Sequence, residues 1–328
     1  MSGPAATADV PHQAVVLCAG EGRRLRPFTS RCPKPLLPFL NVPLLEHVLA
    51  FLERGGVRRI ALNAWHLADQ VEDFVAQRAS PGLELHVERE TALLGTGGGL
   101  HNLMPWMEPG PVLVSTADIL TDVDLGSVAA RHVAAGAEAT MVLAPDADVA
   151  RFGAVEVDDD DMLTDIVGIL DRPGRRACVN ASVHVFEPEF LQRLPDGPSC
   201  LVRQGYLPAM EQGARCAGMI HTGAWAELGT PDALLAAQRD ALAGTLPVEA
   251  ALLARGGRRN GSASLVHPDA LVADDALLDG GTVVGAGVEV GAGARVHASL
   301  LLPGARVVPG AAIDHAILDA HPTAVGTS

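Results

Sequence analysis

A six-residue repeat near the C-terminus constrains the fold more than any other feature of this sequence. Eight aliphatic residues recur at this spacing, and a residue that is mostly small or β-branched stands four positions after each. No helix or ordinary strand has a period of six, whereas a three-sided β coil does, with one inward side chain on each side. A flexible Gly/Ala linker, the alternative, would not keep aliphatic residues in register. The expected inward residues are Val266, Val272, Leu278, Val284, Val290, Val296, Leu302 and Val308.

The repeat predicts a short left-handed parallel β-helix over residues 262–320, with three hexads in each coil. His297 and His315 are eighteen residues apart, so they are expected to stack on consecutive coils. A metal ion bound between them is one interpretation. Two exposed histidines at corners of the coil is the favoured one.

Residues 14–243 follow a different pattern. Short apolar runs alternate with amphipathic stretches, beginning with a buried strand at 14–17 and a helix at 43–54. This alternation predicts an α/β domain with a doubly wound, mixed but mostly parallel sheet. Further strands are expected at 60–62, 83–87 and 112–114, and further helices at 67–78, from 97–99, and at 231–243.

The later part of this domain is expected to be antiparallel, because its strands come without helices between them. Four consecutive acidic residues, Asp158–Asp161, fall between two of these strands, and a solvated hairpin turn is favoured there over a metal site. Residues 244–261 are interpreted as a linker. The antiparallel strands are expected at 154–157, 165–169 and 179–186.

Composition excludes several classes of function. The chain has 328 residues and a formal net charge of −15, which argues against nucleic acids and anionic membranes as partners. No apolar run reaches the roughly 20 residues of a membrane helix, and residues 1–13 lack the pattern of a secretion signal. Five scattered cysteines without a CxxC pair indicate reduced thiols. A cytoplasmic protein is expected.

The first strand leads directly into a basic, glycine-rich loop. Glycines after a strand let the backbone approach a phosphate closely, and Gly20 and Gly22 follow the strand here. Pro33 and Pro35 restrict the direction of the residue between them. In so acidic a chain, this concentration of cations favours a phosphate site over an incidental basic turn. The cations are Arg23, Arg24, Arg26, Arg31 and Lys34.

A dinucleotide-binding oxidoreductase also places a glycine loop after its first strand. That class needs a third glycine opening the next helix and an acidic residue closing the second strand. Leu25 occupies the glycine position, and the second strand ends at Asn63 and Ala64. Both requirements fail, so this class is excluded.

The chain resembles the sugar-nucleotide pyrophosphorylases, which are sugar-1-phosphate nucleotidyltransferases. Gly20–Pro27 followed by Pro33–Pro35 looks like the signature of that family, and weaker motifs follow in the family order. The resemblance covers about residues 14–243 and implies a Rossmann-like nucleotidyltransferase fold with Mg²⁺ as cofactor. A β-helix tail is also common in the family and is expected to supply contacts between copies of the chain. The weaker motifs are Leu94–Gly99, Ala117-Asp118, Phe152-Gly153, Asp171–Pro173, Asn180-Ala181 and Trp225–Pro231.

The resemblance implies that a sugar-1-phosphate oxygen attacks the α-phosphorus of a nucleoside triphosphate and displaces pyrophosphate. Positioning and cations carry such a reaction. Arg24 would then grip the triphosphate tail and Lys34 the reacting phosphates, while Asp118 and Glu227 would bind Mg²⁺. The nucleotide would lie against Ala19, Gly20, Gly22, Gly95, Thr96, Gly97 and Gly98, and the sugar phosphate against Gly153, Asp171, Arg172 and Asn180.

The sequence departs from the family pattern at four positions. Glu227 replaces the usual second aspartate and Arg172 the usual lysine, and Ala117 and Ser182 each replace a common glycine. Structural interpretations also stay open: Asp118 as the cap of a helix starting near residue 121, and Glu227 as a surface carboxylate.

The pattern favours the mannose-1-phosphate guanylyltransferase branch of the family. An N-acetylmuramate-1-phosphate uridylyltransferase or another NDP-sugar synthase is the alternative within the family. A catalytically silent nucleotide-sugar sensor is the alternative from another class.

Overall fold

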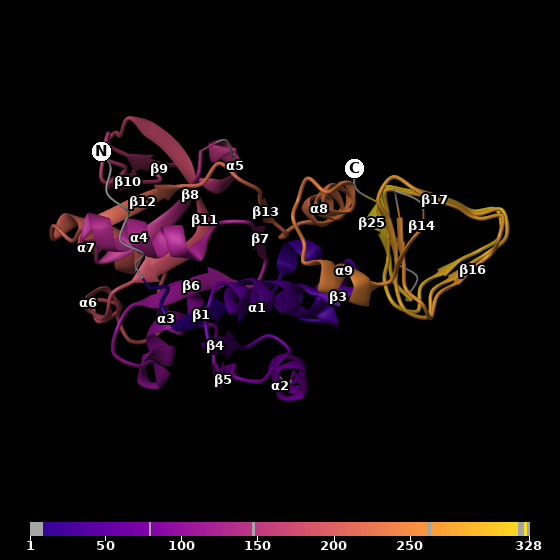
Figure 1. Ribbon diagram of the computed structural model, residues 1–328, viewed down its shortest axis with the longest axis horizontal. Coiled ribbons are helices and arrows are strands. Elements are labelled where there is room, and N and C mark those ends of the chain that lie inside the picture. Colours follow the sequence, from indigo (N-terminus) through magenta and orange to yellow (C-terminus); the bar gives the residue numbers. More distant parts are fainter. Residues whose placement is uncertain (1–8, 79, 146–147, 261–263, 321–324, 327–328) are drawn as a thin grey trace. The chain divides into compact units, whose positions relative to one another are not determined.

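The computed structural model describes residues 9–78, 80–145, 148–260, 264–320 and 325–326 (Figure 1). Residues 1–8 of the N-terminal stretch and residue 261 of the predicted linker lie outside this part. Contacts divide the chain into two compact units. We call residues 1–20 with 49–225 the sheet unit, and residues 21–48 with 226–328 the coil unit.

Among the described residues, nine strands form the central sheet of the sheet unit: β1 (Gln13–Leu17), β4 (Arg59–Ala64), β5 (Glu84–Arg89), β6 (Val112–Thr116), β8 (Ala139–Ala144), β9 (Val155–Val157), β10 (Leu163–Ile166), β11 (Arg176–Phe186) and β12 (Cys216–Ile220). The strand order is β10-β9-β11-β6-β1-β4-β5, and β8 pairs with β11 and β12. β5, β4, β1 and β6 are parallel. β11 runs antiparallel to β6, β8 and β9. The structure thus confirms an α/β fold with a parallel half followed by antiparallel strands.

Local signals set most element boundaries. Helices α1 (Leu44–Arg54), α2 (Ala68–Gln77) and α8 (Pro231–Ala243) lie where their spacing predicts them. α3 (Gly95–Leu103) begins two residues earlier than expected. The strand predicted at 165–169 is wrong in its bounds, because β10 ends at Ile166 and the left-handed residues Val167 and Gly168 (φ 52° and 68°) turn the chain away.

The structure confirms two further expectations, one about the acidic turn in the sheet unit and one about the cysteines. Asp158–Asp161 is a turn between β9 and β10, in which Asp158 Oδ1 accepts hydrogen bonds from Asp160 N and Met162 N, both at 2.9 Å. All five cysteines are free thiols. In the part of the chain that the structure describes, no helix is long and apolar enough to cross a membrane.

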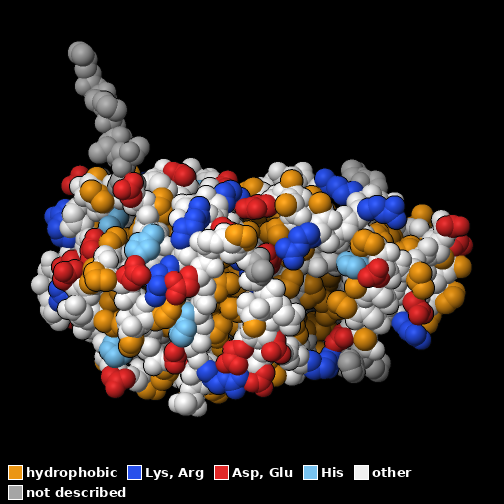
Figure 2. Space-filling view, turned by 60° about the horizontal axis from the view of Figure 1, so that its bottom comes forward, with side chains coloured by type: hydrophobic (Ala, Val, Ile, Leu, Met, Phe, Trp, Pro, Cys, Tyr) orange, Lys and Arg blue, Asp and Glu red, His pale blue; other side chains and the backbone are white. Residues whose placement is uncertain are grey.

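Charged side chains of both signs are spread over the surface. Figure 2 shows acidic side chains across much of the visible face, with basic ones interspersed among them. The net charge of −15 is therefore not confined to one patch of this face.

Three stacks of short parallel strands build the C-terminal coil, which we define as residues 264–320. The first stack is β15 (Ser264–Val266), β18 (Thr282–Val284), β21 (Leu300–Leu301) and β24 (Ala316–Leu318). The second is β16 (Leu271–Val272), β19 (Glu289–Val290) and β22 (Arg306–Val307), and the third is β17 (Leu277–Asp279), β20 (Arg295–His297) and β23 (Ala312–Asp314). The coil has a three-sided outline in Figure 1. Antiparallel strands β14 (Arg258–Asn260) and β25 (Val325–Gly326) cover the two ends of the first stack.

The hexad register holds up to Val296 and then shifts by one residue. Leu278 pairs with Val296, eighteen residues on, but Val296 pairs with Ile313, seventeen residues on. The prediction that Val308 points inward is therefore wrong: Val308 is 67% exposed and Val307 is 5% exposed. Likewise Leu301, not Leu302, pairs with Val284.

A difference in corner length explains this shift. The corner after Asp279 contains two left-handed glycines, Gly280 and Gly281 (φ 64° and 89°). The equivalent corner after His297 turns with the single left-handed residue Ala298 (φ 46°) and is one residue shorter. The tighter corner contains one residue fewer. Every later inward side chain therefore comes one residue earlier in the sequence than predicted.

His297 and His315 do not stack on consecutive coils. His297 aligns with Asp314, and its Nδ1 lies 2.6 Å from Asp279 Oδ1. His315 Nε2 lies 3.7 Å from Asp232 Oδ1 instead. Both imidazoles are partly exposed, as expected for corner residues, and the predicted stacking is wrong because of the shorter corner.

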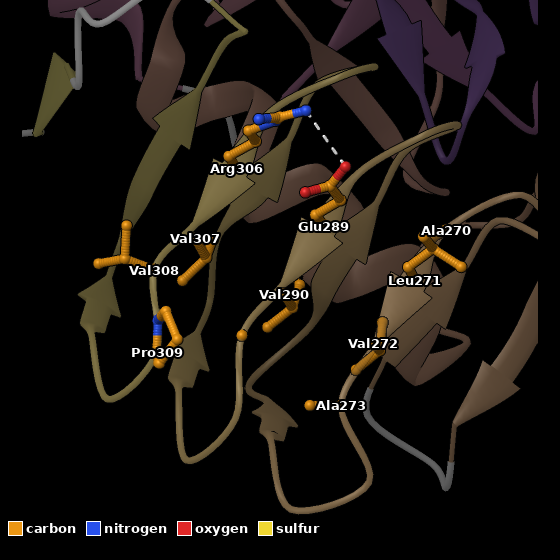
Figure 3. Close-up of a pocket in the computed structure, with 11 residues that line it drawn as sticks. Ala270, Leu271, Val272, Ala273, Glu289, Val290, Arg306, Val307, Val308 and Pro309 are labelled. Carbon is orange, nitrogen blue, oxygen red and sulfur yellow. Dashed lines mark hydrogen bonds and ion pairs between the residues drawn. The ribbon is translucent and has the colours of Figure 1, made fainter.

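One side of the coil carries an open groove over the sheet of β16, β19 and β22. Figure 3 shows Glu289 and Arg306 bridging neighbouring strands at the edge of this groove, with 3.3 Å between Oε1 and Nη2. Leu271 and Val308, which line the groove, are 69% and 67% exposed. This face therefore combines exposed aliphatic side chains with an ion pair.

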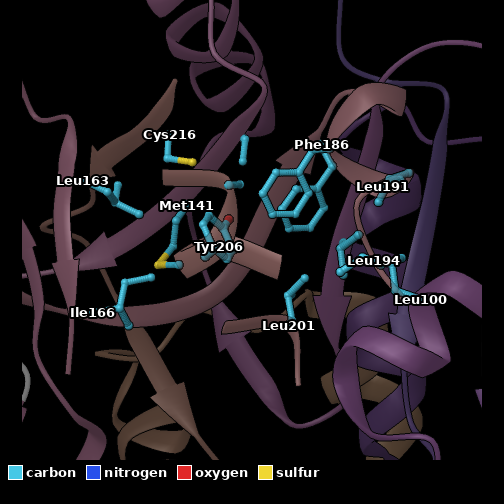
Figure 4. Close-up of a cluster of buried hydrophobic side chains, with 14 of the residues drawn as sticks. Leu100, Met141, Leu163, Ile166, Phe186, Leu191, Leu194, Leu201, Tyr206 and Cys216 are labelled. Carbon is cyan, nitrogen blue, oxygen red and sulfur yellow. The ribbon is translucent and has the colours of Figure 1, made fainter. Parts of the chain in front are cut away.

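Each unit has its own hydrophobic core. In the sheet unit, Phe186 stacks on Phe190 with 4.6 Å between ring centroids, and the Tyr206 ring lies 5.1 Å from Phe190 (Figure 4). Tyr206 Oη lies 2.9 Å from His184 Nδ1, and burial lowers the pKa of His184 to about 3, so this imidazole is neutral. Most of the other side chains in this core are aliphatic.

The core of the coil leads to a first prediction, because Val284 is fully buried among aliphatic side chains. Val284→Asp should destabilise the coil by about 3 kcal/mol or more, since an unpaired carboxylate would enter an apolar core. Hydrogen exchange of the coil amides measures this loss. Val308→Asp is the matched control and should leave protection unchanged. Equal losses in both variants would contradict the register described above.

Candidate active site

Three predicted site residues gather at one edge of the sheet unit. β1, β4 and β6 are parallel, so their carboxyl ends meet at the same edge, where α/β sheets place their ligands. Ala19 and Gly20 follow β1, and Asp118 follows β6. Ala117 N donates to Leu17 O at 3.1 Å, which joins the two strand ends.

Asp118 occupies the turn between β6 and β7 (Ile119–Thr121). The interpretation of Asp118 as a helix cap is wrong, because α4 (Leu125–Ala135) is capped by Asp124, which accepts a hydrogen bond from Ser127 N at 2.8 Å. Asp118 is therefore placed by the sheet and not by a helix.

The glycine segment Gly95–Gly98 is bonded through its backbone to residues about a hundred positions later. Gly97 N and Gly98 N donate to Ser199 O at 2.9 and 3.4 Å. Leu201 N donates to Thr96 Oγ1 at 2.9 Å. Two first-turn N–H groups of α3, those of Gly97 and Gly98, are thus already used within the protein, and the segment presents a closely packed backbone surface.

Glycine is required where this segment meets residues 197–201. A Cβ on Gly97 would lie 2.8 Å from Ser199 Oγ, and one on Gly98 would lie 2.3 Å from Gly197 O. Residues 201–206 form a π-helix, a rare element that is frequent at functional sites. The prediction from sequence missed this partner, because nothing local to the glycine run indicates it.

A buried polar network fixes the start of the same segment. Asn63 Nδ2 donates to Glu90 Oε1 at 2.7 Å, and Leu94 N donates to Glu90 Oε2 at 2.9 Å. Cys18 N donates to Asn63 Oδ1 at 2.8 Å. Glu90 is 4% exposed and Asn63 is 2% exposed. The network therefore ties the ends of β1, β4 and β5 to the glycine segment, and sequence reasoning missed both side chains.

The loop that bears Asp171 and Arg172 is organised by one buried carboxylate. Asp165 is 2% exposed and accepts hydrogen bonds from four backbone N–H groups, those of Ile166, Ile169, Leu170 and Arg172, at 2.6 to 3.2 Å. Burial raises the pKa of Asp165, but these donors outweigh it and hold the pKa below its ordinary value. The carboxylate thus shapes a loop whose last residues, Asp171 and Arg172, are exposed.

The same loop lies against Gly153. Val167 N donates to Ala154 O at 2.7 Å, and a Cβ on Gly153 would lie 2.6 Å from Val167 Cγ1. Gly153 also has a φ of 89°, so glycine is needed for both conformation and space. Three of the four residues predicted for the sugar phosphate therefore belong to one packed arrangement.

Asn180, the fourth, lies on the adjacent strand. It stands two residues beyond Cys178, which pairs with Val155 of β9. Its Oδ1 accepts a hydrogen bond from Ser182 N at 2.8 Å, across a bulge where Ser182 has a φ of 61°. Ser182 thus adopts, without glycine, the left-handed conformation that a glycine adopts freely.

A cavity of about 290 Å³ adjoins these residues in the sheet unit. The Phe152 and Trp225 rings lie edge to face in its wall, 5.3 Å apart, and Trp225 Nε1 donates to Ala181 O at 3.0 Å. His221, also in the wall, has its Nε2 2.9 Å from Asp122 Oδ1. Sequence reasoning gave these side chains no role, although Phe152 and Trp225 belong to motifs of the resemblance. The lining residues are Ala144, Pro145, Asp148, Phe152, His221, Thr222, Gly223 and Trp225.

The coil unit brings together Arg24, Lys34 and Glu227. Arg24 Nη2 donates to Glu227 Oε1 at 2.9 Å, and Lys34 Nζ lies 3.7 Å from the same oxygen. The side chains of Lys34 and Glu227 are each 12% exposed, whereas Arg24 is 59% exposed. Glu227 is therefore not a solvated surface carboxylate, because it faces both cations predicted to bind phosphate.

Glycines again allow this approach. Gly22 is left-handed (φ 62°), and a Cβ there would lie 2.9 Å from Thr29 Cγ2 and 3.0 Å from Lys34 Cβ. A Cβ on Gly229 would lie 2.0 Å from Glu227 Oε1. Short 3₁₀ turns at Arg23–Leu25 and Lys34–Leu36 carry the two cations.

Lys34 also stands out by composition, because it is the only lysine in the sequence; the other twenty-three basic residues are arginines. An ammonium is a compact charge that can follow several phosphate oxygens, whereas guanidinium is a planar fork. The chain thus places its single lysine ammonium in the predicted phosphate site.

The fold and these clusters together define a nucleotide-binding α/β protein with a cationic site beside a glycine loop. Residues 13–244 match the model of the family described as nucleotidyl transferase. The chain is 32% identical over 261 residues to mannose-1-phosphate guanylyltransferase of Mycobacterium tuberculosis, across 79% of this chain and 72% of that protein. The chain belongs to the nucleotidyl transferase family and resembles its sugar-nucleotide pyrophosphorylases.

Other relatives match a smaller share of their own length. The catalytic subunit beta of mannose-1-phosphate guanylyltransferase from Drosophila melanogaster is 30% identical across 67% of this chain, which spans 60% of that protein. UTP–glucose-1-phosphate uridylyltransferase of Synechocystis is 29% identical across 56% of this chain and 51% of that protein. The solved structure of HddC from Yersinia pseudotuberculosis complexed with GMP-PN has a TM-score of 0.59 at 22% identity, covering 68% of this chain and 96% of that chain. This last likeness supports the fold alone.

The buried carboxylate of the loop gives a second prediction. Asp165→Asn should destabilise the protein by about 1–3 kcal/mol, because an amide offers one acceptor oxygen where four donors converge. Folding lowers the pKa of Asp165. The contribution of its ionised carboxylate to the stability of the fold is therefore fully present above the ordinary carboxyl pKa of about 4, and it is lost as the pH falls through the pKa of the folded state.

Urea unfolding from pH 8 to pH 3 measures the difference in the free energy of unfolding between the wild type and Asp165→Asn. It should be constant down to about pH 5 and shrink in stronger acid. Asp159→Asn, at a side chain that is 80% exposed, is the control and should cost little. A difference that grows on acidification would contradict the role of the ionised Asp165.

Proposed function

We propose that the chain transfers the guanylyl group of GTP to mannose-1-phosphate, producing GDP-mannose and pyrophosphate. The observation that carries this proposal is the cluster of Arg24 and Lys34 on Glu227 beside the left-handed Gly22. Two cations at a glycine loop, in a chain of net charge −15, suit a triphosphate. The names of the Mycobacterium and Drosophila relatives support GTP and mannose-1-phosphate as the substrates.

The chemistry needs charge and position more than a general base. The attacking oxygen belongs to a phosphate monoester, whose second pKa of about 6 leaves it largely ionised at neutral pH. Arg24 would bind the triphosphate tail, and Lys34 would meet the negative charge that develops on the reacting phosphates. Both cations now face Glu227, so an arriving triphosphate would draw them to its own oxygens.

Mg²⁺ is the proposed cofactor, and the carboxylates of Asp118 and Glu227 would hold it. Carboxylate oxygens suit this hard cation, which is usually bound by one or two carboxylates with substrate phosphates completing the set. Within the described ranges, no group of three or more His, Cys, Asp or Glu side chains is arranged to hold a metal ion. When bound, the ion would neutralise part of the phosphate charge. A glutamate in place of the family's aspartate lengthens this ligand by one methylene.

The remaining predicted residues have proposed roles in binding. The nucleotide would lie on Ala19, Gly20 and Gly22 and on the closely packed segment Gly95–Gly98. The organised loop and Asn180 would receive the sugar phosphate, through Asp171, Arg172 and the backbone at Gly153. The packing of these residues described above supports the proposal, because such sites need rigid backbone.

A second candidate function is transfer of a uridylyl group. The Synechocystis relative named UTP–glucose-1-phosphate uridylyltransferase favours this candidate, and an N-acetylmuramate-1-phosphate uridylyltransferase belongs to the same class. A silent nucleotide-sugar sensor would bind the same ligands without turnover.

We also propose that residues 14–243 form a doubly wound catalytic domain, residues 244–261 a connection, and residues 262–320 a left-handed β-helix. Within the connection lie α9 (Ala250–Gly256) and β14. The coil would supply contacts between copies of the chain, and the exposed Leu271 and Val308 of its groove support this idea. Light scattering of the full chain measures the oligomeric state.

The metal proposal gives a third prediction. Activity should require Mg²⁺, and Asp118→Asn should lower kcat by about a hundredfold or more, in the range of a lost electrostatic contribution to the transition state. Asp69→Asn, at a side chain that is 84% exposed, is the control and should leave kcat unchanged. Pyrophosphate release in excess chelator at the full rate would refute the metal site.

The single lysine gives a fourth prediction, which separates an enzyme from a sensor. Lys34→Ala should lower kcat/KM much more than it weakens GTP binding, since the ammonium meets charge that develops in the transition state. Lys34→Arg should also lose most of the activity, because a planar fork replaces a point charge. Calorimetric titration of GTP beside steady-state turnover measures both quantities. Equal losses of affinity and rate in the alanine variant would count against a catalytic Lys34.

A further inference from the structure

The hairpin that follows Lys34 ends in a buried, left-handed tip. β2 (Pro38–Phe39) and β3 (Val42–Pro43) pair antiparallel, and Leu40 and Asn41 between them have φ values of 51° and 62°. Two consecutive left-handed residues are what a tight type I′ turn requires. Leu40 is 0% exposed, so the tip is inserted into the coil unit and not displayed at its surface.

The side chain of Asn41 joins this tip to two other elements. Asn41 Nδ2 donates to Gly256 O at 2.8 Å, at the end of α9, and to Val284 O at 2.9 Å, in β18 of the C-terminal coil. Both hydrogens of the amide are thereby used on backbone carbonyls that lie more than two hundred residues later. The contact is close, because a Cβ on Gly256 would lie 2.0 Å from Leu40 O.

Two ion pairs attach the same segment, residues 21–48, at other points. Arg31 pairs with Asp319 near the end of the coil. Arg255 Nη1 of α9 lies 3.1 Å from Glu46 Oε1, and the Glu46 side chain is 9% exposed. The segment is thus held to α9 and to the coil on both sides of the hairpin.

Short backbone connections lead from the tip to Lys34. Leu44 N donates to Leu37 O at 3.1 Å across the base of the hairpin, and Leu37 N donates to Lys34 O at 3.1 Å. Pro33 and Pro35 restrict the backbone on either side of Lys34. A displacement of the tip would therefore move the 3₁₀ turn that carries the ammonium.

We propose that the C-terminal coil is a positioning element of the active site, and that Asn41 is the residue through which it holds the segment bearing Arg24 and Lys34. Asn41 touches no substrate in this account; it acts through the position of Lys34. The proposal rests on the proposed function for the role of Lys34, but the attachment itself is independent of the substrates. The coil then serves catalysis within a single chain.

Asn41→Gly isolates the two hydrogen bonds, because glycine adopts a φ of 62° freely and keeps the turn. Asn41→Asp removes both donors at nearly constant size, and its protonated form regains one O–H donor. Glu289→Gln, at a partly exposed ion pair of the coil, is the control. All three variants are made in the full chain.

Two measurements test the proposal. Hydrogen exchange at residues 34–37 should be at least about fivefold faster in Asn41→Gly than in the wild type, because the variant loses two neutral hydrogen bonds. Amides of the sheet unit should keep their protection. The kcat/KM for GTP with mannose-1-phosphate should fall by about fivefold or more in both Asn41 variants, and not in Glu289→Gln.

The pH dependence distinguishes positioning from a general loss of stability. Relative to wild type, Asn41→Asp should recover activity as the pH is lowered from 8 to 5, because its carboxyl group gains a proton to donate. The activity of Asn41→Gly relative to that of the wild type should stay constant over the same pH range. A flat ratio for both variants would contradict the hydrogen-bonding role of Asn41.

Two results would overturn the proposal: unchanged exchange at residues 34–37 in Asn41→Gly, or faster exchange there with an unchanged kcat/KM. A wild type that does not turn over GTP and mannose-1-phosphate would refute the substrates proposed above. In that case exchange at residues 34–37 still decides whether Asn41 holds the segment, and GTP affinity replaces turnover as the second readout.

Discussion

The interaction on which the candidate site depends is the pairing of Glu227 with two cations. Arg24 and Lys34, which lie in short 3₁₀ turns, both face one carboxylate oxygen of Glu227, and glycines allow this approach. In the absence of substrate, like charges held this close would repel, and a shared carboxylate offsets that repulsion. The same carboxylate is the proposed ligand of Mg²⁺, so substrate and metal would each release part of the cluster.

Polar side chains removed from bulk water, Asp165 fully and Asn41 in part, hold the binding segments of the two units by similar means. The carboxylate of Asp165 shapes the loop of Asp171 and Arg172, and the amide of Asn41 fixes the hairpin after Lys34. Asp165 accepts four backbone hydrogen bonds and Asn41 donates two, and such pairing is the condition under which a polar group removed from water stabilises a structure. Hydrogen bonds made by single side chains therefore fix irregular segments near the proposed substrates.

The fold could be predicted from local periodicity in the sequence. Contacts between residues far apart in the sequence could not be predicted in this way. Strands and helices of the sheet unit follow from apolar spacing, and the hexads predict a three-sided coil. The register after Val296 could not be predicted, because it depends on whether a corner turns with Gly280 and Gly281 or with Ala298 alone. The predicted site residues fall into packed clusters, but the side chains that hold them, such as the buried Glu90 and the half-buried Asn41, contact residues far away in sequence and carry no local signal.

Pyrophosphate release by the wild-type chain, measured across pairs of nucleoside triphosphate and sugar-1-phosphate with Mg²⁺, decides whether the protein is a transferase. We expect turnover that requires both substrates, with the highest kcat/KM for GTP and mannose-1-phosphate. A preference for UTP would keep the transferase and change the base. Tight binding of triphosphates without pyrophosphate release from any pair would refute the transferase function, because the cationic cluster would then serve recognition alone.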